Sequence, residues 1–176
     1  IQPENPDFFR SHAELHAQSP SDNLAILGKV VWPSGDGSKS VNFVMAHVQG
    51  SGGEHFGYSA LHPYSFLDWR FFYTANVTVR RDLVDDWLRD GFSDAFPLAA
   101  WEDAEFAYRM FQRKERPFRI FYTPASVGTH SHQFSLDTFI NRQNASGMMA
   151  GAFCDLYPAS DIHNLIGTDI VYDALR

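Results

Sequence analysis

The chain has 176 residues and a mass of 20.0 kDa, enough for one domain with its own hydrophobic core or for part of a larger domain. Hydrophobic residues make up 44% and charged residues 20%, which excludes a disordered chain, and no run of 18 apolar residues could span a membrane. The net charge of −7, without a basic stripe, excludes a typical nucleic-acid surface. Cys154 is the single cysteine, so a disulfide within the chain is excluded and we expect a reducing, cytoplasmic compartment.

The first residues show neither an initiator methionine nor the basic-then-apolar pattern of a signal peptide. We therefore expect the chain to be a piece of a longer protein. An N-cap at Asn5 and an apolar face predict a helix over 6–18. A strand is expected at Leu24–Trp32, a weak helix at 41–48 and a loop at 50–53. The apolar face of the first helix consists of Phe8, Phe9, His12, Leu15 and His16.

A period of two in the apolar residues predicts a second strand over Phe71–Val79. After it, the pattern predicts a short helix at 82–88 and a loop at 91–94. The clearest helix is expected at 101–115, a strand at 118–122 and a long helix at 135–153. Strands that alternate with helices indicate an α/β fold. We expect one domain over residues 1–155 and leave 156–176 as an unassigned tail.

Three carboxylates, Glu102, Asp103 and Glu105, fall in the first turn and a half of the helix that starts near Trp101. Acidic residues there complement the helix dipole, and this needs no function. A tryptophan directly beside the pair Glu102 and Asp103 favours a pocket wall over a solvated face. The helix start is therefore a candidate site.

A second candidate is the pair His130 and His132, which follows a predicted strand. On an extended segment both rings of a His-x-His pair point to the same side, which suits metal ligation or a shared substrate contact. A structural or surface role explains such a pair about as well.

These residues belong to a longer pattern that resembles the second half of a family 2 glycosyltransferase domain of the GT-A type. The Glu-Asp motif with its trailing Arg109 and the histidine that completes the family's metal site stand in the family's order. One departure is Ser93, which stands where the family usually has an acid. The matching pieces are residues 1–32, 72–81, 91–96, 101–109 and 130–147.

The resemblance implies a mixed-sheet, nucleotide-diphospho-sugar transferase-like fold. The family's metal-binding Asp-x-Asp and nucleotide-binding strands have no counterpart in this sequence. We therefore expect the chain to begin just after them and to need the N-terminal half of the same parent domain as its partner. The chain alone is expected to be inactive, with any membrane contact, such as at the inner face of the membrane, made by parts outside it.

The activity that the resemblance implies is inverting transfer of a sugar from a nucleotide-diphosphate donor, UDP-type above all, to a hydroxyl of a carbohydrate or other acceptor. Asp103 is the candidate base, with Glu102 as the second choice or as an acceptor contact. A cofactor, Mg²⁺ or Mn²⁺, would take one imidazole, from His130 or His132. The candidate acceptor contacts are Trp69, Asn76 and Trp101.

Two other functions fit the same residues. In a non-catalytic carbohydrate-binding or interaction module, the aromatic side chains stack on sugars and the acids are incidental. In a metal-dependent hydrolase, Asp103 works together with His130 and His132, and product is released without an acceptor.

Overall fold

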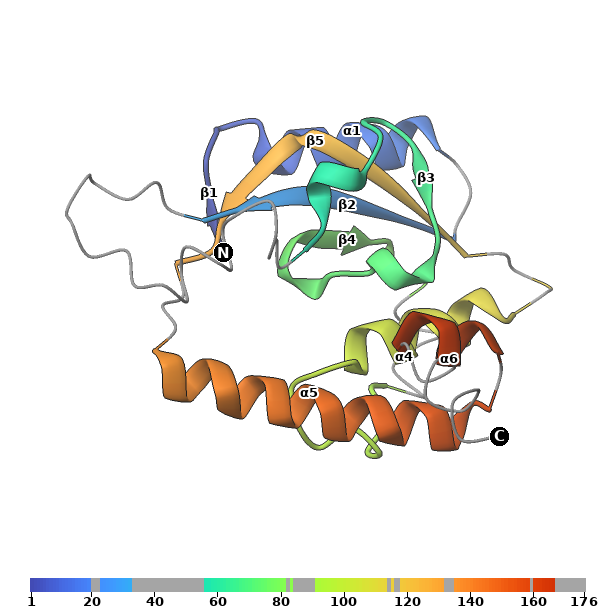
Figure 1. Ribbon diagram of the computed structural model, residues 1–176. Coiled ribbons are helices and arrows are strands. Elements are labelled where there is room, and N and C mark those ends of the chain that lie inside the picture. Colours follow the sequence, from blue (N-terminus) through green and yellow to red (C-terminus); the bar gives the residue numbers. More distant parts are fainter. Residues whose placement is uncertain are drawn as a thin grey trace.

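The computed structural model of the protein is a mixed α/β arrangement around a curled mixed sheet (Figure 1). It describes residues 1–19, 23–32, 56–81, 83, 91–113, 115, 118–131, 135–158 and 160–166. The α/β class predicted from the sequence is confirmed. None of the described helices is both long enough and apolar enough to cross a membrane.

Two parallel strands, β2 (Leu24–Val31) and β5 (Arg119–Thr129), form the centre of the sheet. β4 (Val77–Val79) pairs antiparallel with β2, so the order is β1-β5-β2-β4. The short strands β1 (Gln2–Pro3) and β3 (Phe66–Leu67) pair antiparallel with opposite ends of β5. The run of apolar residues in β2 reflects its position, because a parallel neighbour and covering layers bury it on both faces.

Helices lie on both sides of this sheet. Figure 1 shows α1 along one side and α4, α5 and α6 together on the other. Side chains of Trp69, Tyr108 and Phe153 meet edge to face between these layers, so the many aromatic residues form a dense core there. The helices are α1 (Phe8–Gln18), α4 (Glu102–Phe111), α5 (Leu136–Leu156) and α6 (Ser160–Ile166), and three-residue 3₁₀ turns are η1 (Tyr58–Ala60), η2 (Trp69–Phe71) and η3 (Thr74–Asn76).

Helix α5 begins where the sequence places it. Ser135 and Thr138 form a capping box: the Ser135 hydroxyl accepts from the Thr138 N–H, and the Thr138 hydroxyl accepts from the Ser135 N–H. The helix runs three residues beyond the predicted end, to Leu156.

The predicted strand over Phe71–Val79 is wrong in its first two thirds. Only Val77–Val79 pair with β2, while Phe71 ends one 3₁₀ turn and Thr74–Asn76 form another. The turns bury both Trp69 and Phe72 in the core. In an extended chain these two residues, three positions apart, would lie on opposite faces.

Two helix boundaries also differ from those expected. The first helix starts at Phe8 after an Asp7 N-cap, and Phe9 is 70% exposed instead of lying on its apolar face. The helix after Trp101 ends at Phe111, before residue 115. The expected elements at 41–48 and 50–53, and that at 82–88 apart from Leu83, lie outside the described residues.

Strand β5 continues to Thr129, far beyond the predicted end at Tyr122, because the sheet accommodates a proline in a bulge. Gly28 pairs with Thr123 and the next residue, Lys29, pairs with Val127, so residues 124–126 have no partner on β2. Pro124, which has no N–H to donate, lies in this irregular stretch.

The side chain of Asn76 fills the bulge. Its Nδ2 donates to the carbonyl oxygens of Lys29 (3.0 Å) and Ser126 (3.1 Å), which satisfies polar groups that the broken ladder exposes. The amide needs the space beside Gly28, where a Cβ atom would lie 2.3 Å from Asn76 Nδ2. Asn76 thereby fixes the 3₁₀ turn η3 to the sheet.

Candidate functional site

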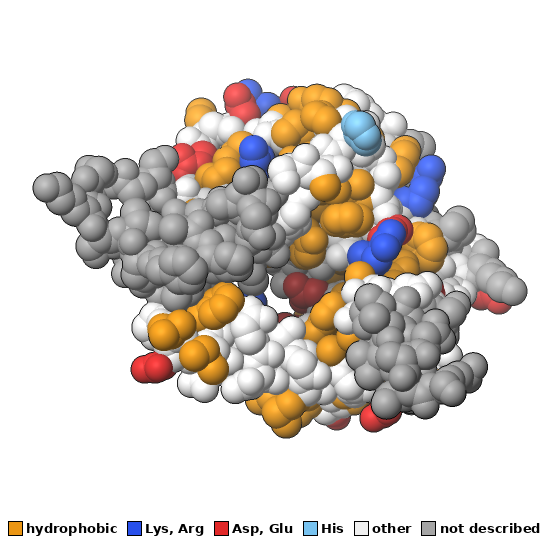
Figure 2. Space-filling view, in the orientation of Figure 1, with side chains coloured by type: hydrophobic (Ala, Val, Ile, Leu, Met, Phe, Trp, Pro, Cys, Tyr) orange, Lys and Arg blue, Asp and Glu red, His pale blue; other side chains and the backbone are white. Residues whose placement is uncertain are grey.

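A cavity of about 430 Å³ lies where η2, the two residues between η2 and η3, the start of α4 and the middle of α5 meet. In Figure 2 the surface is hollowed between the sheet and α5, and acidic side chains lie at the bottom of the hollow. The wall is made of aromatic rings, two acids, two arginines and small side chains. The lining residues are Phe56, Arg70, Phe72, Tyr73, Ala99, Ala100, Trp101, Glu102, Asp103, Ala104, Arg142, Gln143, Ser146 and Leu165.

Asp103 lies in the first turn of α4 and is held by a residue 29 positions earlier. Its Oδ2 accepts from the backbone N–H of Thr74 (3.0 Å) and from the Thr74 hydroxyl (2.7 Å). Burial raises the pKa of the Asp103 carboxyl, and the two hydrogen bonds from Thr74 oppose that rise. The result is a fixed, partly desolvated carboxylate in a cavity wall, which is what a proton acceptor requires.

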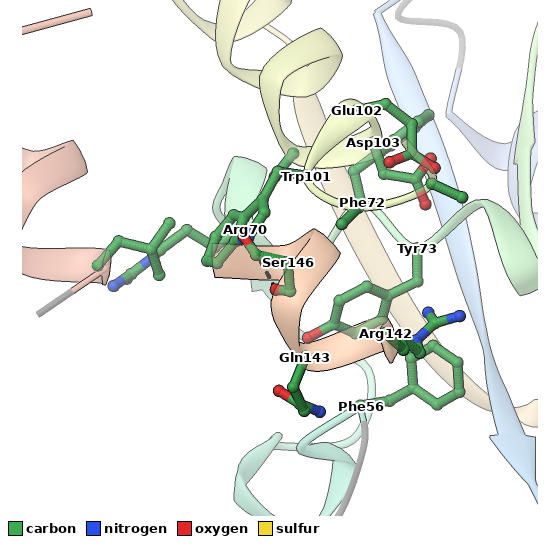
Figure 3. Close-up of a pocket in the computed structure, with 14 residues that line it drawn as sticks. Phe56, Arg70, Phe72, Tyr73, Trp101, Glu102, Asp103, Arg142, Gln143 and Ser146 are labelled. Atoms are coloured by element: carbon green, nitrogen blue, oxygen red, sulfur yellow. Dashed lines mark hydrogen bonds between the residues drawn. The ribbon is translucent and has the colours of Figure 1, made fainter. Parts of the chain in front are cut away.

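Glu102 lies beside it at the same helix end (Figure 3). Burial raises its pKa most; the negative charge of Asp103 raises it further, and the positive charge of Arg142 on α5 opposes the rise. The Oε2 atom of Glu102 is buried and receives no hydrogen bond from any described residue. A buried carboxylate oxygen without a donor is unfavourable by itself, so it marks this corner as one where a ligand hydroxyl would gain a hydrogen bond.

Trp101 gives the cavity a wall that joins two helices. Its indole N–H donates to the carbonyl oxygen (3.0 Å) and the hydroxyl (3.1 Å) of Ser146 in α5. The residue has a left-handed backbone with φ +67°, which is costly for a large side chain and is retained mainly where the surroundings impose it. Such strain is common at functional sites.

The third acid of the motif, Glu105, has a structural role. It is 1% exposed, its Oε1 accepts from the Tyr157 hydroxyl (2.7 Å), and Nε of Arg109 lies 2.6 Å from the same oxygen. Arg109 also donates to the carbonyl oxygen of Gly91 (2.6 Å). Glu105 and Arg109 therefore tie α4 to the end of α5 and to the preceding loop, while Glu102 and Asp103 are left to the cavity.

His130 lies behind the cavity wall. It follows the end of β5, its ring packs against Trp32 (4.8 Å between centroids) and Phe56 (6.5 Å), and Phe56 in turn packs against Tyr73 (5.2 Å). Phe56 and Tyr73 line the cavity and His130 does not. The residue paired with it in the sequence prediction, His132, lies outside the described residues.

The described residues do not by themselves fit the expected Mg²⁺ or Mn²⁺ site. Nowhere among them do three His, Cys, Asp or Glu side chains gather closely enough to hold a metal ion. The pair Glu102 and Asp103 offers two carboxylates in the cavity wall.

Two predicted acceptor contacts lie in the interior. Trp69 is 5% exposed and packs against Tyr108 and Phe153. Asn76 is 4% exposed, and its amide is hydrogen-bonded to the carbonyl oxygens of Lys29 and Ser126 and to the imidazole of His12. Nε2 of His12 lies 3.2 Å from Asn76 Oδ1. Neither residue lines the cavity, whereas Trp101 does.

A scan against protein-family models, a search of curated proteins and a search of solved structures each found no match to this chain.

Several residues of the site were not predicted as site residues from the sequence. Thr74, which holds Asp103 from outside the cavity lining, and Arg142, which lines the cavity and whose charge acts on Glu102, stand 29 and 40 positions from those acids. Both fall within the pieces that carry the family resemblance, which is the one signal that could have marked them. Tyr73 falls within one of the same pieces. Phe56 carries no such signal, because an aromatic residue in a chain rich in them is expected in the core.

Proposed function

We propose that this chain forms the acceptor side of an inverting glycosyltransferase domain of the GT-A type, with Asp103 as the general base. The setting of Asp103 carries the proposal: its carboxylate lies in the wall of a cavity of about 430 Å³, with one oxygen held by Thr74. Burial raises its pKa, so it is a stronger base than a solvated aspartate. The family resemblance supplies the reaction type.

In the proposed reaction, a hydroxyl oxygen of the acceptor attacks the anomeric carbon of a nucleotide-diphosphate sugar. Asp103 takes the hydroxyl proton as the new carbon–oxygen bond forms. The bond from the anomeric carbon to the diphosphate breaks, and the nucleoside diphosphate leaves with the electron pair. Attack opposite to the leaving group inverts the anomeric configuration. Glu102 accepts a hydrogen bond from a second acceptor hydroxyl, or replaces Asp103 as base.

The remaining cavity wall suits a carbohydrate. The rings of Tyr73 and Trp101 offer faces for stacking on a sugar, and Arg142, Gln143 and Ser146 on α5 offer polar groups to its hydroxyls (Figure 3). A pocket with aromatic faces and a few polar groups orients a polyhydroxylated acceptor without needing a large net charge.

The proposal includes partners beyond this chain. A UDP-type donor would bind the N-terminal half of the same parent domain. The diphosphate would be neutralised by Mg²⁺ or Mn²⁺, held by one imidazole, from His130 or His132, and by ligands outside the described residues. We place the activity in the cytoplasm because Cys154 is the single cysteine.

The first test measures the melting temperature of the full-length parent polypeptide with UDP, with Mn²⁺ and with both. A ligand that binds only the folded protein stabilises it by about 2.7 kcal/mol at a hundredfold excess over Kd. We expect a shift with both ligands that exceeds the two separate shifts. The absence of any shift, with UDP and with other nucleotides, would contradict the proposal and favour the binding module.

The second test is Asp103→Asn in the same polypeptide. Loss of a general base lowers kcat by about 10² to 10⁴-fold, while nucleotide binding is unchanged. The matched control is Asp137→Asn, an exposed acid in the first turn of α5, which should keep full activity. Metal-dependent product release without an acceptor, at a rate that adding one does not change, would indicate the hydrolase instead.

A further inference from the structure

Asp103 takes both of its described hydrogen bonds on one oxygen, and both come from one residue. The Thr74 N–H lies 3.0 Å and the Thr74 hydroxyl 2.7 Å from Asp103 Oδ2. No described residue donates to Oδ1. One oxygen of the carboxylate is thus anchored, and the other is left to bind a ligand.

Thr74 can do this because of its place in a short turn. It is the first residue of η3, where a backbone N–H has no partner within the turn and is free for another acceptor. The last residue of the same turn, Asn76, is bonded to the bulge at Lys29 and Ser126 and lies against His12. The turn is therefore fixed to the sheet at one end and presents two donors to α4 at the other.

We infer that Thr74 is the positioning residue of the proposed reaction: it orients the Asp103 carboxylate and keeps it ionised for the acceptor hydroxyl. The inference rests on the proposed function. Both donors favour the charged form of the carboxylate, and this opposes the effect of its burial. The two donors therefore limit the rise in pKa that burial causes, so that the carboxylate is ionised in its cavity, and its free oxygen has a fixed direction.

Among the described residues, the other charged and titratable side chains that line the cavity with Asp103 are Glu102 on α4, Arg142 on α5, Arg70 on η2 and Tyr73 directly before the turn. A substitution at Thr74 replaces none of these side chains. Arg70 is engaged by Asp68, which it meets with two nitrogens. A Thr74 variant therefore reports the contribution of the threonine itself.

The first experiment measures the pKa of Asp103 directly, by pH titration of the carboxyl carbon in ¹³C-aspartate-labelled protein, with the signal assigned from Asp103→Asn. Thr74→Val has the shape of threonine and loses one donor, so the pKa should rise. Thr74→Ser keeps both donors and should titrate like the wild type. An equal pKa in Thr74→Val and wild type would overturn the inference. Thr74→Ala gives the same comparison if the valine variant does not fold.

The second experiment follows sugar transfer by the full-length polypeptide against pH. In Thr74→Val, kcat should fall about tenfold and the acid limb of the kcat profile should move to higher pH with the carboxyl titration, while Thr74→Ser restores both. If the pKa of the Asp103 carboxyl rises in Thr74→Val while the acid limb of its kcat profile stays in place, the positioning role is overturned. No transfer by the wild type would instead overturn the proposed function, and the titration distinguishes this failure from the first.

Discussion

The indole N–H of Trp101 donates to both the carbonyl oxygen and the hydroxyl of Ser146. This contact joins the residue before α4 to the middle of α5, across 45 positions of sequence, and it lies in the wall of the cavity. The carboxylates of Glu102 and Asp103 follow Trp101 directly, so the same contact sets where the two acids stand relative to α5.

Replacing Trp101 by Phe should weaken this junction. The variant keeps an aromatic ring and loses the indole donor, so the free energy of unfolding should fall by about 1 kcal/mol. Urea unfolding of Trp101→Phe, Ser146→Ala and the double variant measures the coupling. We expect the double variant to lose less than the sum of the two single changes, and strict additivity would show that the two residues do not stabilise each other.

Gly28 and Gly151 should respond in opposite ways to alanine. A Cβ at Gly28 would lie 2.3 Å from Asn76 Nδ2 and 2.6 Å from the Ser126 carbonyl oxygen, so Gly28→Ala must displace the amide that fills the bulge and should cost about 1–3 kcal/mol. At Gly151, inside α5, a Cβ meets nothing within 4 Å, and Gly151→Ala should stabilise by about 0.5–1 kcal/mol. Thermal unfolding of both variants checks the pair.

Asp103→Asn should make the protein more stable at neutral pH. The pKa of Asp103 is raised in the folded state, mainly by burial, so the folded protein holds this proton more tightly than the unfolded chain. The stabilisation from this proton is present in full below the unfolded pKa near 3.8 and is lost as the pH rises from there through the higher folded pKa. The neutral amide avoids that loss.

The measurement is the melting temperature of both proteins from pH 3 to pH 7.5. The gain from Asp103→Asn should be largest at neutral pH and should vanish below about pH 3.8. Asp137→Asn, the control, removes an exposed acid from the first turn of α5 and should lower stability by up to about 0.5 kcal/mol. A wild type more stable than Asp103→Asn at pH 7 would contradict the prediction.

His12 should make the protein sensitive to mild acid. Burial lowers its pKa most, and the positive charge that His16 acquires adds to this, against the hydrogen bond with Asn76. Because Asn76 donates through its nitrogen to two carbonyls, its Oδ1 must accept from His12 Nε2–H. Neutral His12 then accepts at Nδ1 from the Thr78 hydroxyl, 2.9 Å away, and that hydroxyl accepts from His16 Nε2 at 3.1 Å.

The sign of the pH effect follows from the lowered pKa. Below about pH 6.5 the unfolded chain binds the His12 proton more tightly than the folded protein, so the free energy of unfolding should fall between pH 7 and pH 5. His16, whose pKa burial lowers and which also faces Arg80, acts in the same direction. The fall in the free energy of unfolding should be smaller in His12→Gln. It should be the same as in the wild type in His62→Gln, which changes an exposed residue. Chemical denaturation at pH 5 and pH 7 measures both.

Periodicity was enough to predict several elements, whereas the N-cap expected at Asn5 lies at Asp7. The buried strand from Leu24, the capped helix after Ser135 and the acid-headed helix after Trp101 are confirmed, because their signals come from neighbours in sequence. The sequence also placed Trp101, Glu102 and Asp103 together at a helix start, and all three line the cavity.

The tertiary structure decided which of the marked residues share a site. Asp103 and Glu105 belong to one motif, yet the Oε1 atom of Glu105 is bound by Tyr157 and Arg109 in the interior, while Asp103 meets Thr74 at the cavity. A helix turns by about 100° per residue, so acids two positions apart face different surroundings, and nothing local says which surroundings these are.

The same reason applies to the 3₁₀ turn before β4. Alternating apolar residues over Phe71–Val79 predict a strand, but burial of Phe72 and the bonds of Asn76 to the bulge between β2 and β5 favour two tight turns. By itself the sequence determined the α/β class and the helix that carries the acids. The hydrogen bonds of Asp103 with Thr74 and of Glu105 with Tyr157 span 29 and 52 positions, and they form only when the sheet and α5 close around α4.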